Sequence, residues 1–130
     1  MKASILARIF ITLFVCLLLV NCQADDRAAA KVVENYFTAL IAKDPQRLST
    51  LSCSDWEASA QTDLESFGAV SAEIFDLSCD STGEDGEYTL VTCKGKIVAN
   101  YGDEILELNL SDQSYQTLYE GGEWRMCGYR

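Results

Sequence analysis

The chain has 130 residues, of which 10 are Lys or Arg and 20 are Asp or Glu, with no histidine and a formal charge of −10. This balance argues against electrostatic binding to nucleic acid or anionic lipid, and makes cations the natural counter-partners. Without histidine, acid–base catalysis and zinc binding each lose their most common side chain.

Residues 1–22 are predicted to be a bacterial export signal. The first eight residues contain Lys2 and Arg8 and no acidic residue, and the next twelve, 9–20, contain one polar residue, Thr12. As a helix this apolar run would be roughly 18 Å long, against roughly 30 Å for the core of a bilayer. Its length and its charged flank therefore match a signal peptide better than a transmembrane helix.

The signal ends in Leu-Val-Asn-Cys, residues 19–22, which resembles the lipobox of bacterial lipoproteins. In that family the cysteine becomes the first residue and is acylated, so we expect Cys22 to anchor an envelope protein to the membrane. Asn21 departs from the pattern, because Gly, Ala or Ser usually precedes the cysteine. The alternatives are cleavage after Ala24, which would release a soluble secreted protein, and an uncleaved anchor.

Residues 23–130 are expected to form one domain that begins with three helices. In residues 25–43 the apolar side chains form one stripe at helical spacing. The stripe consists of Val32, Val33, Tyr36, Phe37, Leu40 and Ile41. Asp44 as N-cap and Pro45 as first helical residue then predict a short second helix.

The third helix is predicted to begin at a capping box, in which Ser54 and Glu57 would satisfy exposed backbone amides. Gly68 is expected to end it. Its inward residues are predicted to be Trp56, Ala60, Leu64 and Phe67.

After Gly68 the apolar pattern changes from helical spacing to alternation. Four strands are predicted, over residues 70–79, 88–101, 104–118 and 123–129. Gly83–Gly86 is expected to be a hairpin turn, because Asp85-Gly86 is a typical turn sequence. The acidic segment Glu84–Glu87 is not expected to bind calcium, because it lacks the ligand spacing of an EF-hand. These elements predict an α+β fold, with three N-terminal helices packed on a curved, four-stranded antiparallel meander.

Two segments resemble the nuclear-transport-factor-2-like (cystatin-like) superfamily. They are Val-Val-x-x-Tyr-Phe-x-Ala-Leu, followed by Lys-Asp, at residues 32–44, and Glu-Gly-Gly-Glu-Trp-Arg-Met at residues 120–126. The resemblance covers about residues 27–129 and implies a sheet that curls round the long helix and leaves a conical pocket. It also suggests a homodimer through the open sheet face. Enzymes of this superfamily place Asp, His and Tyr in the cone, but the pattern places no Asp opposite Tyr36.

Of the six cysteines, Cys16 lies in the predicted signal and Cys22 is the acylation candidate. The remaining four predict two disulfides in an exported domain: Cys53, Cys79, Cys93 and Cys127. Three pairings are possible. A turn at Asp85-Gly86 would place Cys79 opposite Cys93 and leave Cys53 to pair with Cys127. No cofactor or metal is expected, because the chain has neither histidine nor a C-x-x-C pair.

Five aromatic residues are candidates for pocket lining, although filling the core is the competing interpretation. They are Tyr36, Phe37, Trp56, Phe67 and Trp124. Because no catalytic motif is present, we expect a non-catalytic exported domain that binds a small ligand or a protein partner. The alternative is an isomerase- or cyclase-like enzyme that uses Asp and Tyr. A buried Asp within hydrogen-bond reach of a Tyr would favour the enzyme. A cone filled by side chains would exclude both a ligand pocket and an active site.

Overall fold

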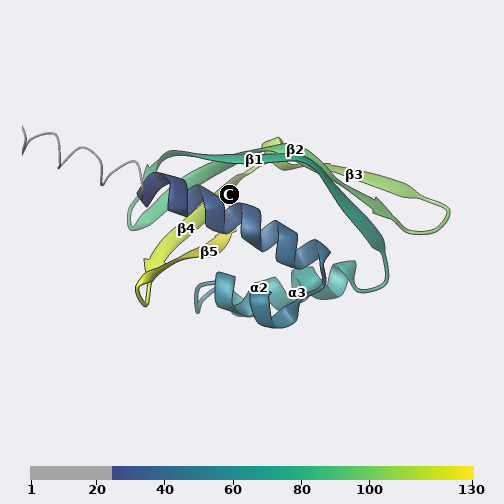
Figure 1. The fold of residues 1–130 in the computed structure, drawn as a ribbon, viewed down its shortest axis with the longest axis horizontal. Helices are drawn as coiled ribbons and strands as arrows, with labels where there is room; N and C mark the ends of the chain where they lie inside the picture. The colour runs from purple at the N-terminus through teal and green to yellow at the C-terminus, as the bar shows by residue number, and fades with distance from the viewer. Residues whose placement is uncertain (1–24) are drawn as a thin grey trace, which may run out of the picture.

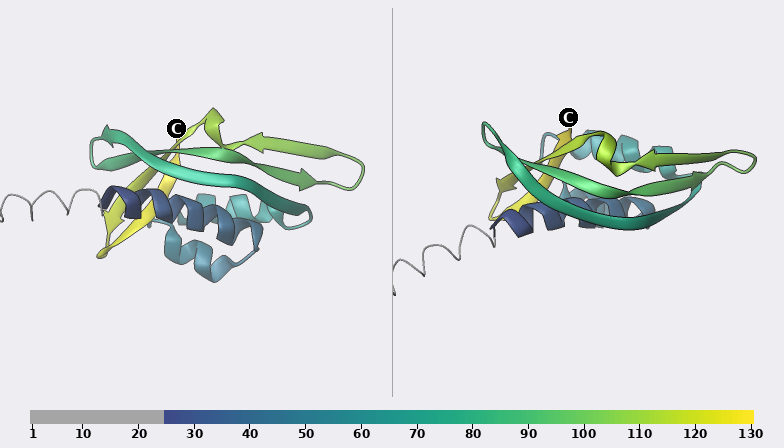
Figure 2. Two further views of the ribbon diagram at one scale, coloured as in Figure 1. Left: turned by 45° about the horizontal axis from the view of Figure 1, so that its top comes forward. Right: turned by 90° about the horizontal axis from the view of Figure 1, so that it is seen from above.

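The computed structural model describes residues 25–130, so the predicted signal and Cys22 lie outside the described range. Three helices precede an antiparallel sheet of five strands, and the architecture is therefore α+β. The first helix occupies residues 25–41, α2 is Pro45–Leu51 and α3 is Glu57–Phe67. The helices lie on one face of the sheet, and β1 and β2 arch over the first helix (Figures 1 and 2). Within residues 25–130, no helix is both long and apolar enough to cross a membrane.

The strands are β1 (Ser71–Asp85), β2 (Tyr88–Asn100), β3 (Ile105–Asn109), β4 (Ser114–Glu120) and β5 (Glu123–Tyr129). The sheet order is β1-β2-β4-β5, with β3 also paired to β2. Strand β1 pairs with one edge of β2. The other edge of β2 pairs with β3 over one part of its length and with β4 over another.

The sheet has five strands instead of the predicted four because the third predicted strand is interrupted. A short 3-10 turn, Leu110–Asp112, separates β3 from β4. The Leu110 side chain is buried there, and its carbonyl oxygen accepts a hydrogen bond of 2.7 Å from the hydroxyl of Tyr115. The chain therefore turns inward at Leu110 instead of continuing along β2, which a purely alternating pattern does not reveal.

The second helix begins as predicted, with Asp44 as its N-cap and Pro45 as its first residue. Lys43 adopts a left-handed backbone conformation with φ 55°, and the Asp44 N–H donates to the Ala39 carbonyl at 3.0 Å, which ends the first helix. Asp44 then caps α2, because its carboxylate accepts a hydrogen bond of 3.0 Å from the Arg47 N–H.

The predicted capping box of the third helix is wrong. The N-cap of α3 is Trp56, without a side-chain cap, and the helix begins at Glu57. Ser54 instead donates its N–H and its hydroxyl to the carboxylate of Glu120 in β4, at 3.1 and 2.8 Å. A long-range charge-assisted pair of hydrogen bonds therefore replaces the local cap.

The apolar stripe of the first helix packs against the concave side of the sheet. Its members Val33, Tyr36 and Leu40 are at most 2% exposed. They share one hydrophobic core with sheet residues that include Ile97, Tyr115 and Met126. Burial of side chains of this size contributes roughly 1.5–3 kcal/mol each, so this helix is a main source of stability.

Two disulfides stabilise this arrangement. Cys79 and Cys93 lie directly opposite each other on β1 and β2, with Cα atoms 4.1 Å apart. Cys53, which follows α2, is joined to Cys127 in β5 with Cα atoms 5.3 Å apart. The pairing favoured by the hairpin register is thus the observed one, and the second bridge ties the helical part to the last strand.

We expect the two bridges to contribute unequally to stability. The cysteines of the Cys53–Cys127 bridge are 74 residues apart and those of Cys79–Cys93 are 14 apart. On the chain-entropy model, the entropy removed from the unfolded chain stabilises the protein by about 4.5 kcal/mol for Cys53–Cys127 and about 3 kcal/mol for Cys79–Cys93. Replacing both Cys53 and Cys127 with Ala should therefore lower the free energy of unfolding in urea more than replacing Cys79 and Cys93. A larger loss from the short-loop pair would contradict this expectation.

Candidate functional site

A pocket of about 380 Å³ lies between the first helix, α3, β3 and the end of β5. Its size is within the range of small-molecule sites, roughly 300–1,000 Å³. The apolar part of its lining consists of Phe37, Leu40, Phe67, Ile97, Leu108 and Leu110, and the polar part consists of Asp63, Ser66, Glu107, Asn109, Asp112, Gln113 and Tyr129. Ligand sites combine apolar walls with polar groups that orient the ligand, and this lining contains both.

One polar group of this pocket is the half-buried carboxylate of Asp63 in α3. Its Oδ2 atom accepts a hydrogen bond of 2.9 Å from the Tyr36 hydroxyl and a short one from the Tyr129 hydroxyl. The indole N–H of Trp56 in turn donates to the Tyr36 hydroxyl oxygen at 3.2 Å. One carboxylate oxygen is therefore held by residues of the first helix and of β5.

Aromatic rings in edge-to-face contact support this network. The chain of contacts runs through Tyr36, Phe37, Tyr115, Tyr129 and Trp56, with centroid distances of 5.1–5.8 Å. Gly128 lies against the Trp56 ring with a φ of 137°, a backbone conformation that other residues rarely adopt. Edge-to-face pairs contribute about 0.5–1.5 kcal/mol each beyond burial, so the network fixes the wall of the pocket.

The surroundings of Asp63 raise the pKa of both tyrosines that bind it. For Tyr36 the causes are burial and then the negative charge of Asp63. For Tyr129 they are burial, the nearby Tyr36 and the hydrogen bond to Asp63. Both phenols therefore stay protonated beyond the pH at which a free tyrosine ionises, and they donate hydrogen bonds to Asp63.

The predicted pocket residues divide into three groups. Phe37 and Phe67 do line the pocket. Tyr36 and Trp56 do not line it: Tyr36 donates to Asp63 of the lining, and Trp56 donates to the Tyr36 hydroxyl. Trp124 is remote from it and pairs with Tyr119 beside a different, shallow hollow.

Two residues of the site, Asp63 and Tyr129, were missed by the sequence analysis. Asp63 lies three residues after Ala60 and four before Phe67, so an acidic side chain on the inward face of the third helix was the available indication. Tyr129 was hidden by a register shift between β4 and β5. Because of this shift, Met126 and Tyr129 both pack on the core although simple alternation would place them on opposite faces.

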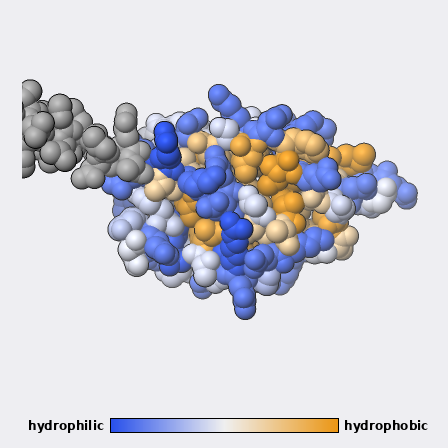
Figure 3. Space-filling model, viewed as in Figure 1, coloured by the Kyte–Doolittle hydropathy of each residue, from blue (hydrophilic) through white to orange (hydrophobic). Residues whose placement is uncertain are grey.

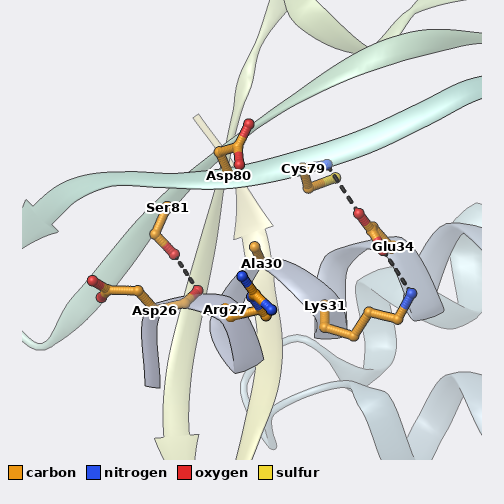
Figure 4. Close-up of a pocket in the computed structure, with 8 residues that line it drawn as sticks. All are labelled: Asp26, Arg27, Ala30, Lys31, Glu34, Cys79, Asp80 and Ser81. Carbon is orange, nitrogen blue, oxygen red and sulfur yellow. Dashed lines mark hydrogen bonds and ion pairs between the residues drawn. The ribbon is translucent and has the colours of Figure 1, made fainter. Parts of the chain in front are cut away.

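A second hollow, between the start of the first helix and β1, is a weaker candidate (Figure 4). Several of its polar groups bind one another: Ser81 donates to the Asp26 carbonyl, Lys31 to Glu34, and the Cys79 N–H to Glu34. Burial raises the pKa of Glu34, but the hydrogen bonds from Lys31 and Cys79 outweigh it and hold the pKa below its usual value. These contacts join the helix to the strand, and the remaining charged side chains of the lining, which include Arg27 and Asp80, carry both signs of charge.

Apolar side chains also gather on the outer surface over β1 and the adjoining helix (Figure 3). Ile41, Ala42, Ile74 and Leu77 line an open hollow there. It contains no charged side chain, so it lacks the oriented polar group that distinguishes the pocket at Asp63.

Comparisons with known proteins identify no family. No family model matches the chain, and no curated protein matches it. Among solved structures, the solution structure of a SEC-C motif containing protein from Rhodopseudomonas palustris is similar, with 12% identity over 79% of each chain and a TM-score of 0.48. A similarity this distant carries no inference about function.

The tyrosine network predicts a loss of stability at alkaline pH. The native state keeps protons that unfolded tyrosines release near pH 10, and Tyr115, whose pKa burial raises to about 12, adds to the effect. The free energy of unfolding should therefore fall as the pH rises above about 10. The Tyr36→Phe variant should lose part of the late-titrating tyrosinate absorbance. A titration identical to that of the wild type would contradict the assigned environment.

Proposed function

We propose that this chain is an exported, lipid-anchored, nuclear-transport-factor-2-like domain that binds a small ligand in the pocket at Asp63. The observation that carries the proposal is an unfilled pocket of about 380 Å³ beside a carboxylate held by two tyrosines. Buried polar groups fixed in an apolar wall are the usual means by which a site orients a ligand. Tyr36 and Phe37 also belong to the hydrophobic core, so the proposal rests on the pocket beside them and not on their burial.

The envelope location is supported by the export-type segment before Cys22 and by the two disulfides. Disulfides persist mainly in oxidising compartments outside the cytoplasm. The first described helix starts within three residues of Cys22, so an acylated cysteine would hold the domain close to the membrane. The β2–β3 hairpin lies at the end of the molecule opposite to the start of the first helix (Figure 1).

An enzymatic use of the same pocket has one observation in its favour, namely an Asp within hydrogen-bond reach of Tyr. However, both phenol protons point to Asp63 and both phenol pKa values are raised. Neither tyrosine is therefore a ready proton donor to a substrate at neutral pH, and Asp63 would have to act alone. Ligand binding needs no such step and is the better-supported function.

Blocking the pocket tests the binding proposal. Ser66 lines the pocket, whereas Thr62, one turn earlier on α3, does not, and both hydroxyls donate to the carbonyl four residues before them. The neutral fluorescent probe N-phenylnaphthylamine should bind the wild type and Thr62→Trp alike. Ser66→Trp should weaken its binding by at least about tenfold, because the indole occupies the pocket. Equal binding by all three proteins would refute the assignment.

The anchor is tested by the intact mass of the mature protein expressed in bacteria. We expect an N-terminal Cys22 that carries a diacylglycerol adduct and a Cys22→Ser variant without the adduct. A mature N-terminus at Asp25 would show instead that the domain is released in soluble form.

A further inference from the structure

The polar lining of the pocket at Asp63 has a single sign of charge. Three carboxylates line it, those of Asp63, Glu107 and Asp112, and no Lys or Arg side chain of the described range does so. Lys96 neutralises Glu107 from outside the lining at 2.9 Å, in a pair that is largely exposed. The charges of Asp63 and Asp112 remain.

Asp63 also has a free acceptor. Tyr36 and Tyr129 both bind Oδ2, whereas Oδ1 accepts no hydrogen bond from residues 25–130. Every buried side-chain oxygen or nitrogen in this range has a partner. Oδ1 is therefore accessible to solvent. The two tyrosines hold Oδ2 and so fix the orientation of the carboxylate.

We propose that the pocket selects ligands in which a protonated amine is attached to a small apolar body. The amine would donate to Asp63 Oδ1, and the apolar body would lie against Phe37, Phe67 and Leu108. An ionised carboxylate only accepts hydrogen bonds, and a bond between it and an ammonium group is among the stronger ones in proteins. An anionic ligand would find no positive group in the lining and would be repelled.

This inference rests on the proposed binding function, and its test separates the two. Naphthylmethylamine, naphthylmethanol and naphthoate share one ring system and carry a cation, a neutral hydroxyl and an anion. Their dissociation constants are measured by calorimetry on the mature protein at physiological ionic strength, so that the general attraction of an acidic protein for cations is screened.

The variants are Asp63→Asn, which keeps the size of the side chain, and Asp55→Asn, which removes an exposed charge outside the pocket. We expect the amine to bind about tenfold or more tightly than the alcohol, and Asp63→Asn to abolish this preference while Asp55→Asn keeps it. Should Asp63→Asn fail to fold, Asp112→Asn at the rim serves instead and should reduce the preference by a smaller factor.

Each other outcome is decisive. If the alcohol binds as tightly as the amine, or the naphthoate binds best, the cation preference is refuted while ligand binding stands. If none of the three compounds binds the wild type, the proposed function fails as well. If Asp55→Asn reduces the preference as much as Asp63→Asn, the effect is general electrostatic attraction and not a property of the pocket.

Discussion

The hydrogen bonds from Tyr36 and Tyr129 to Asp63 are the interaction on which the rest of the site depends. A half-buried carboxylate is costly unless donors replace its lost water, and here the donors lie 27 and 66 residues away in the chain. The network therefore forms only when the first helix, α3 and β5 are all in place. It determines where the wall of the pocket lies and which carboxylate oxygen remains available.

The disulfide between Cys53 and Cys127 acts on the same network. Trp56 follows Cys53 by three residues and Tyr129 follows Cys127 by two, and their rings are in edge-to-face contact at 5.1 Å. The Cys53 N–H also donates to the Met126 carbonyl at 2.8 Å. The bridge thus holds the two segments that supply the aromatic support of Asp63, so that stability and the geometry of the site have a common origin.

Local patterns predicted the elements of the fold better than the site. Helical spacing identified the buried side of the first helix, Asp44-Pro45 identified the start of α2, and the hairpin register identified the Cys79–Cys93 pair. The failures involve distant partners. Ser54 binds Glu120 in β4 in place of a local cap, and Leu110 turns into the core and divides a strand. Asp63 and Tyr129 are brought together by a β-bulge and by tertiary packing, neither of which leaves a periodic trace in the sequence.

The central claim is that the pocket at Asp63 receives a ligand and that Asp63 orients it. The most direct test is to follow the backbone amide NMR signals of the protein during titration with naphthylmethylamine. We expect saturable shifts concentrated at Phe67, Leu108 and Tyr129, around the carboxylate. Shifts confined to exposed acidic segments such as Glu84–Glu87, with none around Asp63, would contradict it.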